Sequence, residues 1–183
     1  MLSGRYTILP MTLANEYRPQ IQFLASYKPA LAKSVHESKD PDGLDIFGNG
    51  FHQFRLGLDI WSGMTWLQYG IAQSVAFSLP KTVSDHKLQA GREYRTVFSL
   101  AHTFEETAKL VLGISRLYVE EKKDQDRKVA NSDQTNHSLF MTGEYFVDAS
   151  SAVRLTLARQ AAVSYNRNTL RSDSLTIAYM RSF

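Results

Sequence analysis

Few side chains in this sequence have the types and spacing that chemistry needs. The one Ser–His neighbour pair is His137–Ser138, and Asp133 lies just upstream. A hydrolytic triad would need these groups aligned beside an oxyanion hole. Adjacent residues of a strand point to opposite faces, so His137 and Ser138 are not expected to act together. The other histidines are His36, His52, His86 and His102, two of them in long loops. We predict no enzyme activity and no catalytic residues.

Metal and cofactor chemistry has equally little support. Asp40, Asp42 and Asp45 resemble the start of a calcium loop, but an EF-hand needs further acidic positions and a closing Glu at fixed spacing. A looser calcium site in that loop stays open. The sequence has no phosphate-cradling glycine motif and no zinc pattern, and it has no cysteine. We therefore predict no metal site and no cofactor.

Composition and charge narrow the class of protein. The net charge of +3 is spread along the chain, and without a concentrated basic arm we expect no nucleic-acid partner. A helical membrane span needs about 20 consecutive apolar residues, and the sequence has no such run. A membrane β-barrel passes this test, because only every second residue must be apolar. A soluble all-β protein and a membrane barrel remain.

Alternation of apolar and polar residues dominates the chain. In the segment 54–61, apolar residues at even positions alternate with Arg55, Gly57, Asp59 and Trp61. Several such segments reach about ten residues, the length that a tilted strand needs to cross a bilayer. The alternation predicts nine strands, the first of them weak and interrupted by Pro10, over the segments 5–13, 17–28, 54–61, 65–79, 94–104, 110–115, 139–148, 153–165 and 175–183.

The connections between these segments alternate in length. The segments 14–16, 62–64, 105–107 and 148–151 are short, whereas 29–50, 80–92 and 121–136 are long and 166–173 is intermediate. Outer-membrane barrels have tight periplasmic turns and long extracellular loops. We therefore predict a single domain over 1–183, an antiparallel up-and-down transmembrane β-barrel with about 8–10 strands in this chain, placed in the bacterial outer membrane.

The last strand carries a further signal. Leu175, Ile177 and Tyr179 alternate with polar residues up to the terminal Phe183. This pattern resembles the signal that the barrel-assembly machinery recognises, so we expect that machinery and the lipid bilayer as partners; a protein partner or an oligomer stays open.

A chain that ends in the periplasm starts on the outer side if it has nine strands. Bacterial barrels have even strand numbers, so either the Pro10 segment is not a full strand, or the chain is the C-terminal part of a larger barrel.

The two faces of such a barrel predict two sets of residues. The polar set lines the lumen: Arg18, Gln20, Gln22, Arg55, Asp59, Gln68, Arg95, Glu144, Arg154 and Gln160. In an eight-stranded barrel these side chains form an ion-pair network that plugs the interior; in a wider pore, their net positive charge favours anionic or polar solutes. Aromatic side chains near strand ends form interfacial girdles, with Tyr17, Tyr27, Trp61, Trp66, Tyr94, Tyr118, Tyr165 and Phe183 as candidates.

Two arginines fit the barrel badly. Arg159 falls on the lipid face near the middle of its expected strand, where a charge costs about 2–4 kcal/mol. Arg116 also falls on the lipid face, but nearer the end of its strand that carries the long loops. A β-bulge would turn either side chain inward; alternatively, the two arginines face a protein partner, or the chain is not a membrane protein.

The region 48–183 resembles a known family. Gly48-Asn49-Gly50 opens a long strand through 54–58, the Trp66 strand ends at Leu79-Pro80, the segment 90–94 opens the next strand, and the closing strand ends in Phe183. These features resemble the C-terminal part of the outer-membrane barrels grouped with the meta-pathway phenol-degradation proteins. That family is regarded as transporters of small, often aromatic compounds, and its members are longer at the N-terminus, which implies a missing strand here.

Three functions are therefore carried forward. The first is an outer-membrane channel or transporter for small molecules. The second is a structural membrane barrel that anchors or sheathes a partner protein. The third is a soluble ligand-binding β-barrel.

Overall fold

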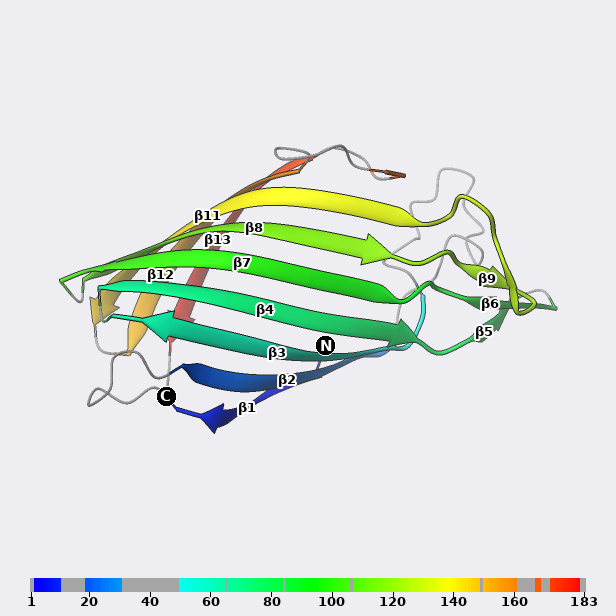
Figure 1. The fold of residues 1–183 in the computed structure, drawn as a ribbon, viewed down its shortest axis with the longest axis horizontal. Coiled ribbons are helices and arrows are strands. Elements are labelled where there is room, and N and C mark those ends of the chain that lie inside the picture. Colours follow the sequence, from blue (N-terminus) through cyan, green and yellow to red (C-terminus); the bar gives the residue numbers. More distant parts are fainter. Residues whose placement is uncertain are drawn as a thin grey trace.

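Nine long strands form one antiparallel sheet in this computed structural model, which describes residues 2–10, 19–30, 50–64, 66–83, 85–105, 107–148, 150–160, 167–168 and 172–181. Each strand pairs with the next one along the chain, in the order β1-β2-β3-β4-β7-β8-β11-β12-β13 (Figure 1). The prediction of an all-β, up-and-down antiparallel chain is thus confirmed. The strands are β1 (Leu2–Leu9), β2 (Gln20–Lys28), β3 (Gln53–Gly63), β4 (Leu67–Ser78), β7 (Glu93–Phe104), β8 (Ala108–Val119), β11 (Gln134–Asp148), β12 (Ser151–Gln160) and β13 (Asp173–Arg181). Across the described ranges, no helix is long and apolar enough to span a membrane.

The register of the sheet gathers the apolar side chains on one face. Ile60 lies opposite Ile71, Ile71 opposite Phe98, and Phe98 opposite Ile114. A shift by one residue would turn every one of these side chains to the other face, so the alternation in the sequence fixes the register.

Burial in this sheet is the reverse of burial in a soluble β-protein. The only buried apolar residues in the described part of the chain are Ala76, Ala101 and Ala152, all on the polar face. Large apolar side chains are exposed instead, as Phe98 at 57% and Ile177 at 70% illustrate. A water-soluble domain buries such residues. An apolar face this continuous needs an apolar surrounding.

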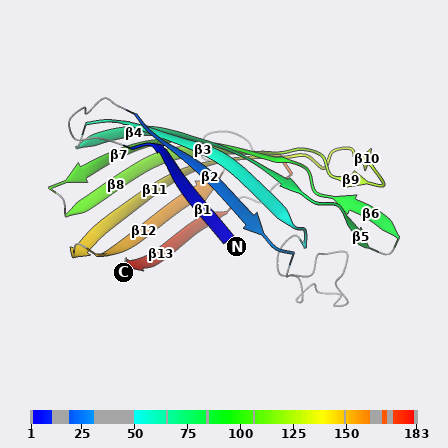
Figure 2. The same cartoon turned by 90° about the horizontal axis from the view of Figure 1, so that it is seen from below.

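The sheet is curved, and its polar face is the concave one. Figure 1 shows β12 and β13 passing behind β3 and β4, and Figure 2 shows the same curvature from below. Side chains on the polar face reach across an intervening strand: Arg55 of β3 pairs with Glu93 of β7 past β4. Lys109 of β8 likewise donates to Gln68 of β4 past β7. Such contacts form only where curvature brings the side chains together.

The sheet is not closed into a barrel, which corrects the prediction of a closed one. β1 and β13 are its two edges, and they do not pair with each other within the described residues. β1 begins at the end with the long connections and β13 ends at the end with the tight turns. The sheet therefore forms a curved wall with an odd number of strands.

The two ends of the sheet differ, as the alternation of connection lengths predicted. Tight connections join β3 to β4, β7 to β8 and β11 to β12. At the other end, four short strands extend the long connections into a second sheet: β5 (Lys81–Val83), β6 (His86–Gln89), β9 (Lys123–Asp124) and β10 (Arg127–Lys128). Figure 1 shows this sheet projecting beyond the large one. The sequence analysis missed these strands, because two to four residues are too few to show alternation.

Aromatic rings lie flat on glycines of the concave face. A Cβ atom added to Gly70 would lie 2.6 Å from Cδ2 of Trp61, and one added to Gly113 would meet the ring of Phe140. The glycines thus leave room for these rings against the backbone of the neighbouring strand.

We predict that Gly70→Ala destabilises the fold by about 1–3 kcal/mol, because the added methyl group displaces Trp61. Unfolding in urea from detergent micelles measures this as a lower midpoint. Gly143→Ala is the matched control, since a Cβ there has no neighbour within 4 Å. Equal midpoints for the two variants would contradict the packing described for Trp61.

Candidate pore lining and membrane face

The concave face holds the described members of the predicted lumen set. Arg18 lies outside the described residues. The register places the other nine on the concave face: Gln20, Gln22, Arg55, Asp59, Gln68, Arg95, Glu144, Arg154 and Gln160. That they line a pore stays a prediction.

Ion pairs on this face run along the wall. The Arg55 guanidinium lies 2.9 Å from a Glu93 oxygen, and Gln53 Nε2 donates to the other oxygen at 2.7 Å. Arg154 pairs with Glu144 across adjacent strands at 3.0 Å. These pairs link side chains one or two strands apart, so they fix the lining without bridging the space inside the curve. The sequence analysis missed Glu93 as a lining residue, because it began the strand at Tyr94 and assigned Glu93 to the segment that precedes it.

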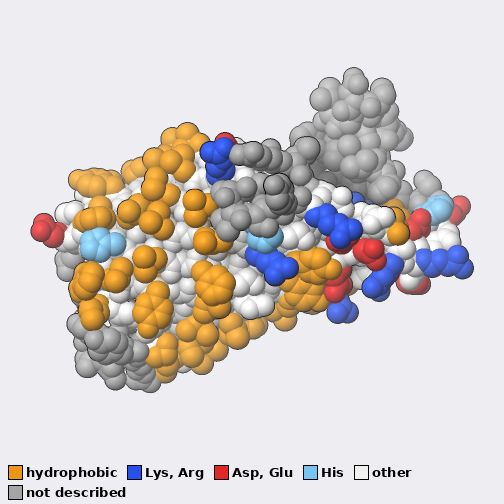
Figure 3. Space-filling view, turned by 45° about the horizontal axis from the view of Figure 1, so that its top comes forward, with side chains coloured by type: hydrophobic (Ala, Val, Ile, Leu, Met, Phe, Trp, Pro, Cys, Tyr) orange, Lys and Arg blue, Asp and Glu red, His pale blue; other side chains and the backbone are white. Residues whose placement is uncertain are grey.

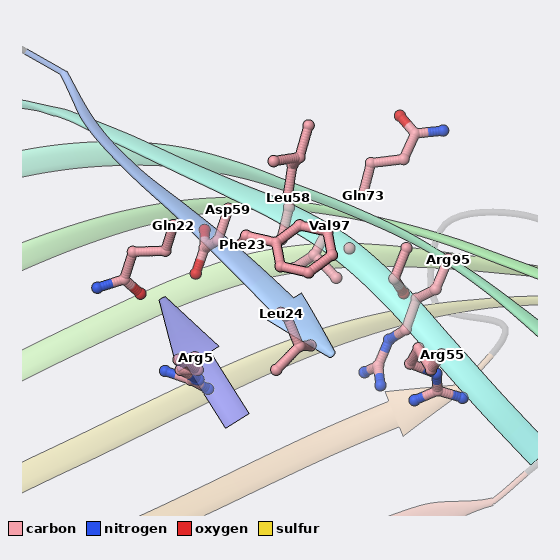
Figure 4. Close-up of a pocket in the computed structure, with 13 residues that line it drawn as sticks. Arg5, Gln22, Phe23, Leu24, Arg55, Leu58, Asp59, Gln73, Arg95 and Val97 are labelled. Atoms are coloured by element: carbon pink, nitrogen blue, oxygen red, sulfur yellow. The ribbon is translucent and has the colours of Figure 1, made fainter. Parts of the chain in front are cut away.

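Three arginines border one hollow of the concave face. A cavity of about 180 Å³ is lined by Arg5, Arg55 and Arg95 together with Asp59 and Gln22. Figure 4 shows the three guanidinium groups on the same side of the sheet, while Leu58 and Gln73 point the opposite way. Arg55 is neutralised by Glu93, whereas Arg5 and Arg95 form no ion pair with a described residue. This hollow is the most cationic part of the lining.

The strand positions of the concave face carry a surplus of positive charge. Six cationic side chains oppose three carboxylates, a difference of three positive charges. The cationic side chains are Arg5, Lys28, Arg55, Arg95, Lys109 and Arg154, and the carboxylates are Asp59, Glu93 and Glu144. Arg5, Lys28 and Lys109 were absent from the predicted lumen set, although their parity within each strand would have identified them.

Trp61 lies on the concave face, so its prediction as a girdle residue is wrong. It pairs with Gln20 and Gly70, and the Lys109 ammonium lies 5.6 Å from its ring centroid. Its parity is that of Arg55 and Asp59, which alternation along β3 already implied. The ring packs inside the curve and not on the convex apolar face.

Other predicted girdle residues do lie on the convex apolar face. At the end with long connections, Tyr94 stacks on Tyr118 with ring centroids 6.2 Å apart. The ring centroids of Tyr27 and Phe54 lie 4.9 Å apart in the same region. Trp66 is exposed in the tight turn at the other end. Tyr17, Tyr165 and Phe183 lie outside the described residues.

Two bands of aromatic side chains therefore flank the apolar face; that they form interfacial girdles stays a prediction. The sequence analysis missed several members that outward parity near a strand end would have found. Phe54 and Phe77 belong to the band at the long connections, and Tyr69, Phe104, Tyr145 and Tyr179 belong to the band at the tight turns.

The residues of the predicted assembly signal share one face. Leu175, Ile177 and Tyr179 all point outward from β13 and are exposed, whereas Phe183 lies outside the described residues. Their recognition by the assembly machinery stays a prediction.

The described histidine candidates lie apart from one another in the fold. His137 faces outward and Ser138 faces inward, where its hydroxyl lies 2.6 Å from that of Ser115. His86 lies in the small sheet, 3.1 Å from Asp124. No group of three or more metal-ligating side chains occurs among the residues that the structure describes. The segment with Asp40, Asp42 and Asp45 lies outside them.

The two arginines that fitted the barrel badly lie on the apolar face, as predicted. Arg159 is the second-last residue of β12 and lies opposite Asp173, 3.7 Å from its carboxylate. The residues 161–165 that the prediction adds to this strand lie outside the described residues. Arg116 points outward from a regular stretch of β8 with no bulge on either side.

The turn between β11 and β12 is fixed by Asp148, at the end with tight turns and beyond the apolar face. Its carboxylate accepts hydrogen bonds from the Ser151 hydroxyl at 2.5 Å and the Ser150 amide at 2.7 Å. Hydrogen bonds from Ser151 and then Ser150 lower the pKa of Asp148 to about 2.

The fold and its two faces define a class: a curved, up-and-down antiparallel sheet that is polar inside the curve and apolar outside. No family model and no curated protein matches this sequence. Among solved structures, the chain is similar to an outer membrane channel from Pseudomonas putida F1, with a TM-score of 0.79 and 11% sequence identity. The similarity covers 99% of this chain and 65% of that channel, so the chain spans just under two thirds of its length. It shows a shared fold.

We predict that Asp148 makes stability depend on pH in acid. A lowered pKa in the folded state means that the carboxylate's contribution is present above the ordinary value of 3.8 and is lost as pH falls towards 2. In Asp148→Ala, urea midpoints measured between pH 2 and 4 should change less than in the unmodified chain. An unchanged pH dependence would show that Asp148 does not fix this turn.

Proposed function

We propose that this chain forms the wall of a channel through the bacterial outer membrane that admits small polar solutes and prefers anions. One observation carries the proposal: most of the large apolar side chains of the sheet lie outside the curve, and most of its charged side chains lie inside it. The similarity to an outer membrane channel supports it. A soluble ligand-binding barrel is disfavoured, because the only buried apolar residues in the described ranges are three alanines.

Closure of the wall is part of the proposal. Lipid offers no hydrogen bonds to backbone groups, so a membrane sheet must close into a ring. β1 and β13 each present an unpaired edge within the described residues. The backbone groups along these two edges therefore need partners that the nine described strands do not supply.

The preference for anions follows from the lining. Ion pairs between neighbouring parts of the wall leave its centre open, whereas a plugged barrel needs pairs across the lumen. Arg5 and Arg95 contribute charges that form no ion pair with a described carboxylate. A fixed positive charge raises the local concentration of anions and lowers that of cations.

The second function, a structural barrel that anchors a partner, uses the same wall with a blocked lumen. No described contact bridges the space inside the curve to block it.

Aromatic compounds, which the resemblance to the phenol-degradation family implies as solutes, would need apolar contacts inside the channel; the cationic hollow favours the acidic members of that class.

We predict anion-selective conductance in planar bilayers under a salt gradient. Arg95→Gln should lower the ratio of chloride to potassium permeability roughly sixfold, because one charge at about 8 Å in water changes the local concentrations of the two ions about 2.4-fold each, in opposite directions. Arg127→Gln removes the same charge from β10, outside the lining, and should leave the ratio unchanged.

Selectivity for cations in the unmodified chain, or equal ratios in the two variants, would contradict the proposed lining. An inserted protein that conducts no ions would favour the structural barrel instead.

A further inference from the structure

A row of polar side chains interrupts the apolar convex face. Gln73, Thr96, Arg116 and His137 lie side by side on β4, β7, β8 and β11, each directly opposite the next. The adjacent row on the same four strands is apolar throughout: Ile71, Phe98, Ile114 and Leu139. Figure 3 shows blue and pale-blue side chains within the orange surface.

Arg116 supplies the charge of this row. Its side chain is exposed, and it forms no ion pair with a residue in the described part of the chain. The second cation nearby is Arg159, opposite Leu139 in the apolar row, but Asp173 partly neutralises it at 3.7 Å. The site therefore has one uncompensated guanidinium and one compensated neighbour.

The height of Arg116 matches a membrane interface. Eight residues separate it along β8 from Ala108, which is next to the tight turn, and a tilted strand of that length rises about 20 Å. The apolar band of an outer-membrane barrel is roughly 25 Å tall. Tyr118, the next outward residue, belongs to the aromatic band at the long connections. A flexible arginine at this level reaches the headgroup region.

Two apolar grooves lie on the tight-turn side of this row, and none of the four side chains of the row lines either of them. One, of about 590 Å³, is lined by Phe98, Ile114, Leu139 and other outward side chains and runs towards the tight-turn end. The other, of about 480 Å³, is lined by Met141 and Leu157 and contains Arg159 and Asp173 at its rim. They share Leu112 and Leu139. A cation above an apolar groove fits an amphiphile with an anionic head.

We propose that this row binds a phosphate-bearing lipid of the leaflet on the side of the long connections. The Arg116 guanidinium and the Thr96 hydroxyl donate to the phosphate, Arg159 adds a second positive charge, and acyl chains fill the grooves. The inference rests on the membrane placement proposed above. A free phosphate ion shares the head chemistry but has nothing to place in the grooves, and a protein partner would offer a carboxylate instead.

The test counts lipids retained by the full chain in detergent, using native mass spectrometry. The probes are dioleoylphosphatidylglycerol, lipopolysaccharide, zwitterionic dioleoylphosphatidylcholine and inorganic phosphate. We expect retention of the two anionic lipids, weaker retention of phosphatidylcholine and none of inorganic phosphate. Loss of one basic residue near a membrane surface corresponds to about a fivefold weaker affinity. Arg116→Gln should show this loss, Arg116→Lys should show less, and Arg127→Gln should match the unmodified chain.

Equal retention of anionic lipid by Arg116→Gln and the unmodified chain would overturn the inference. Retention of inorganic phosphate at the same affinity would do so as well, because the grooves would then add nothing, and so would an oligomer that dissociates in Arg116→Gln. Insertion into phosphatidylcholine vesicles is measured separately by protease protection. Failure to insert would overturn the membrane placement together with this inference, whereas insertion without lipid preference would overturn the inference alone.

Discussion

The hydrogen-bonding needs of the backbone are the constraint on which this structure depends. Each strand of the large sheet pairs with its neighbours along nearly its whole length, up to twelve paired positions between β7 and β8. Because the backbone groups pair within the sheet, only the side chains determine whether each face is polar or apolar. Because side chains alternate, one set can be entirely apolar while the other keeps its charges. The average polarity of the residues along the chain is therefore moderate, although one face of the sheet is almost continuously hydrophobic.

The polar set stays ordered because its members satisfy one another along the curved wall. Arg55, Glu93 and Gln53 form one cluster, and Arg154 and Glu144 form another. Trp61 lies over Gly70 in the same layer. This local satisfaction has a functional consequence: the lining does not need contacts across the lumen to be stable. The cations that remain unpaired are the ones to which the proposed function assigns a solute on the concave face and the proposed lipid site assigns a headgroup on the convex face.

Alternation in the sequence predicted the nine strands, their order and the face of each described lining residue, since parity is a local property. It did not predict features that depend on three dimensions. The short strands β5, β6, β9 and β10 exist because long connections lie side by side. The pair between Arg55 and Glu93 depends on the curvature of the sheet. Closure, which needs the two edges to meet, cannot be derived from alternation, and the nine described strands leave it open. Trp61 is different, since its own parity contradicted its assignment to a girdle.

The central claim is that the chain is the wall of a closed membrane barrel, and the mobility of the refolded protein in SDS gels tests it most directly. The full chain is refolded into detergent micelles and compared with and without boiling. A closed barrel resists SDS at room temperature, so the account predicts a compact, faster band that shifts to the unfolded position only after boiling. A chain that stays folded and soluble without detergent, and whose mobility does not change on boiling, would contradict it.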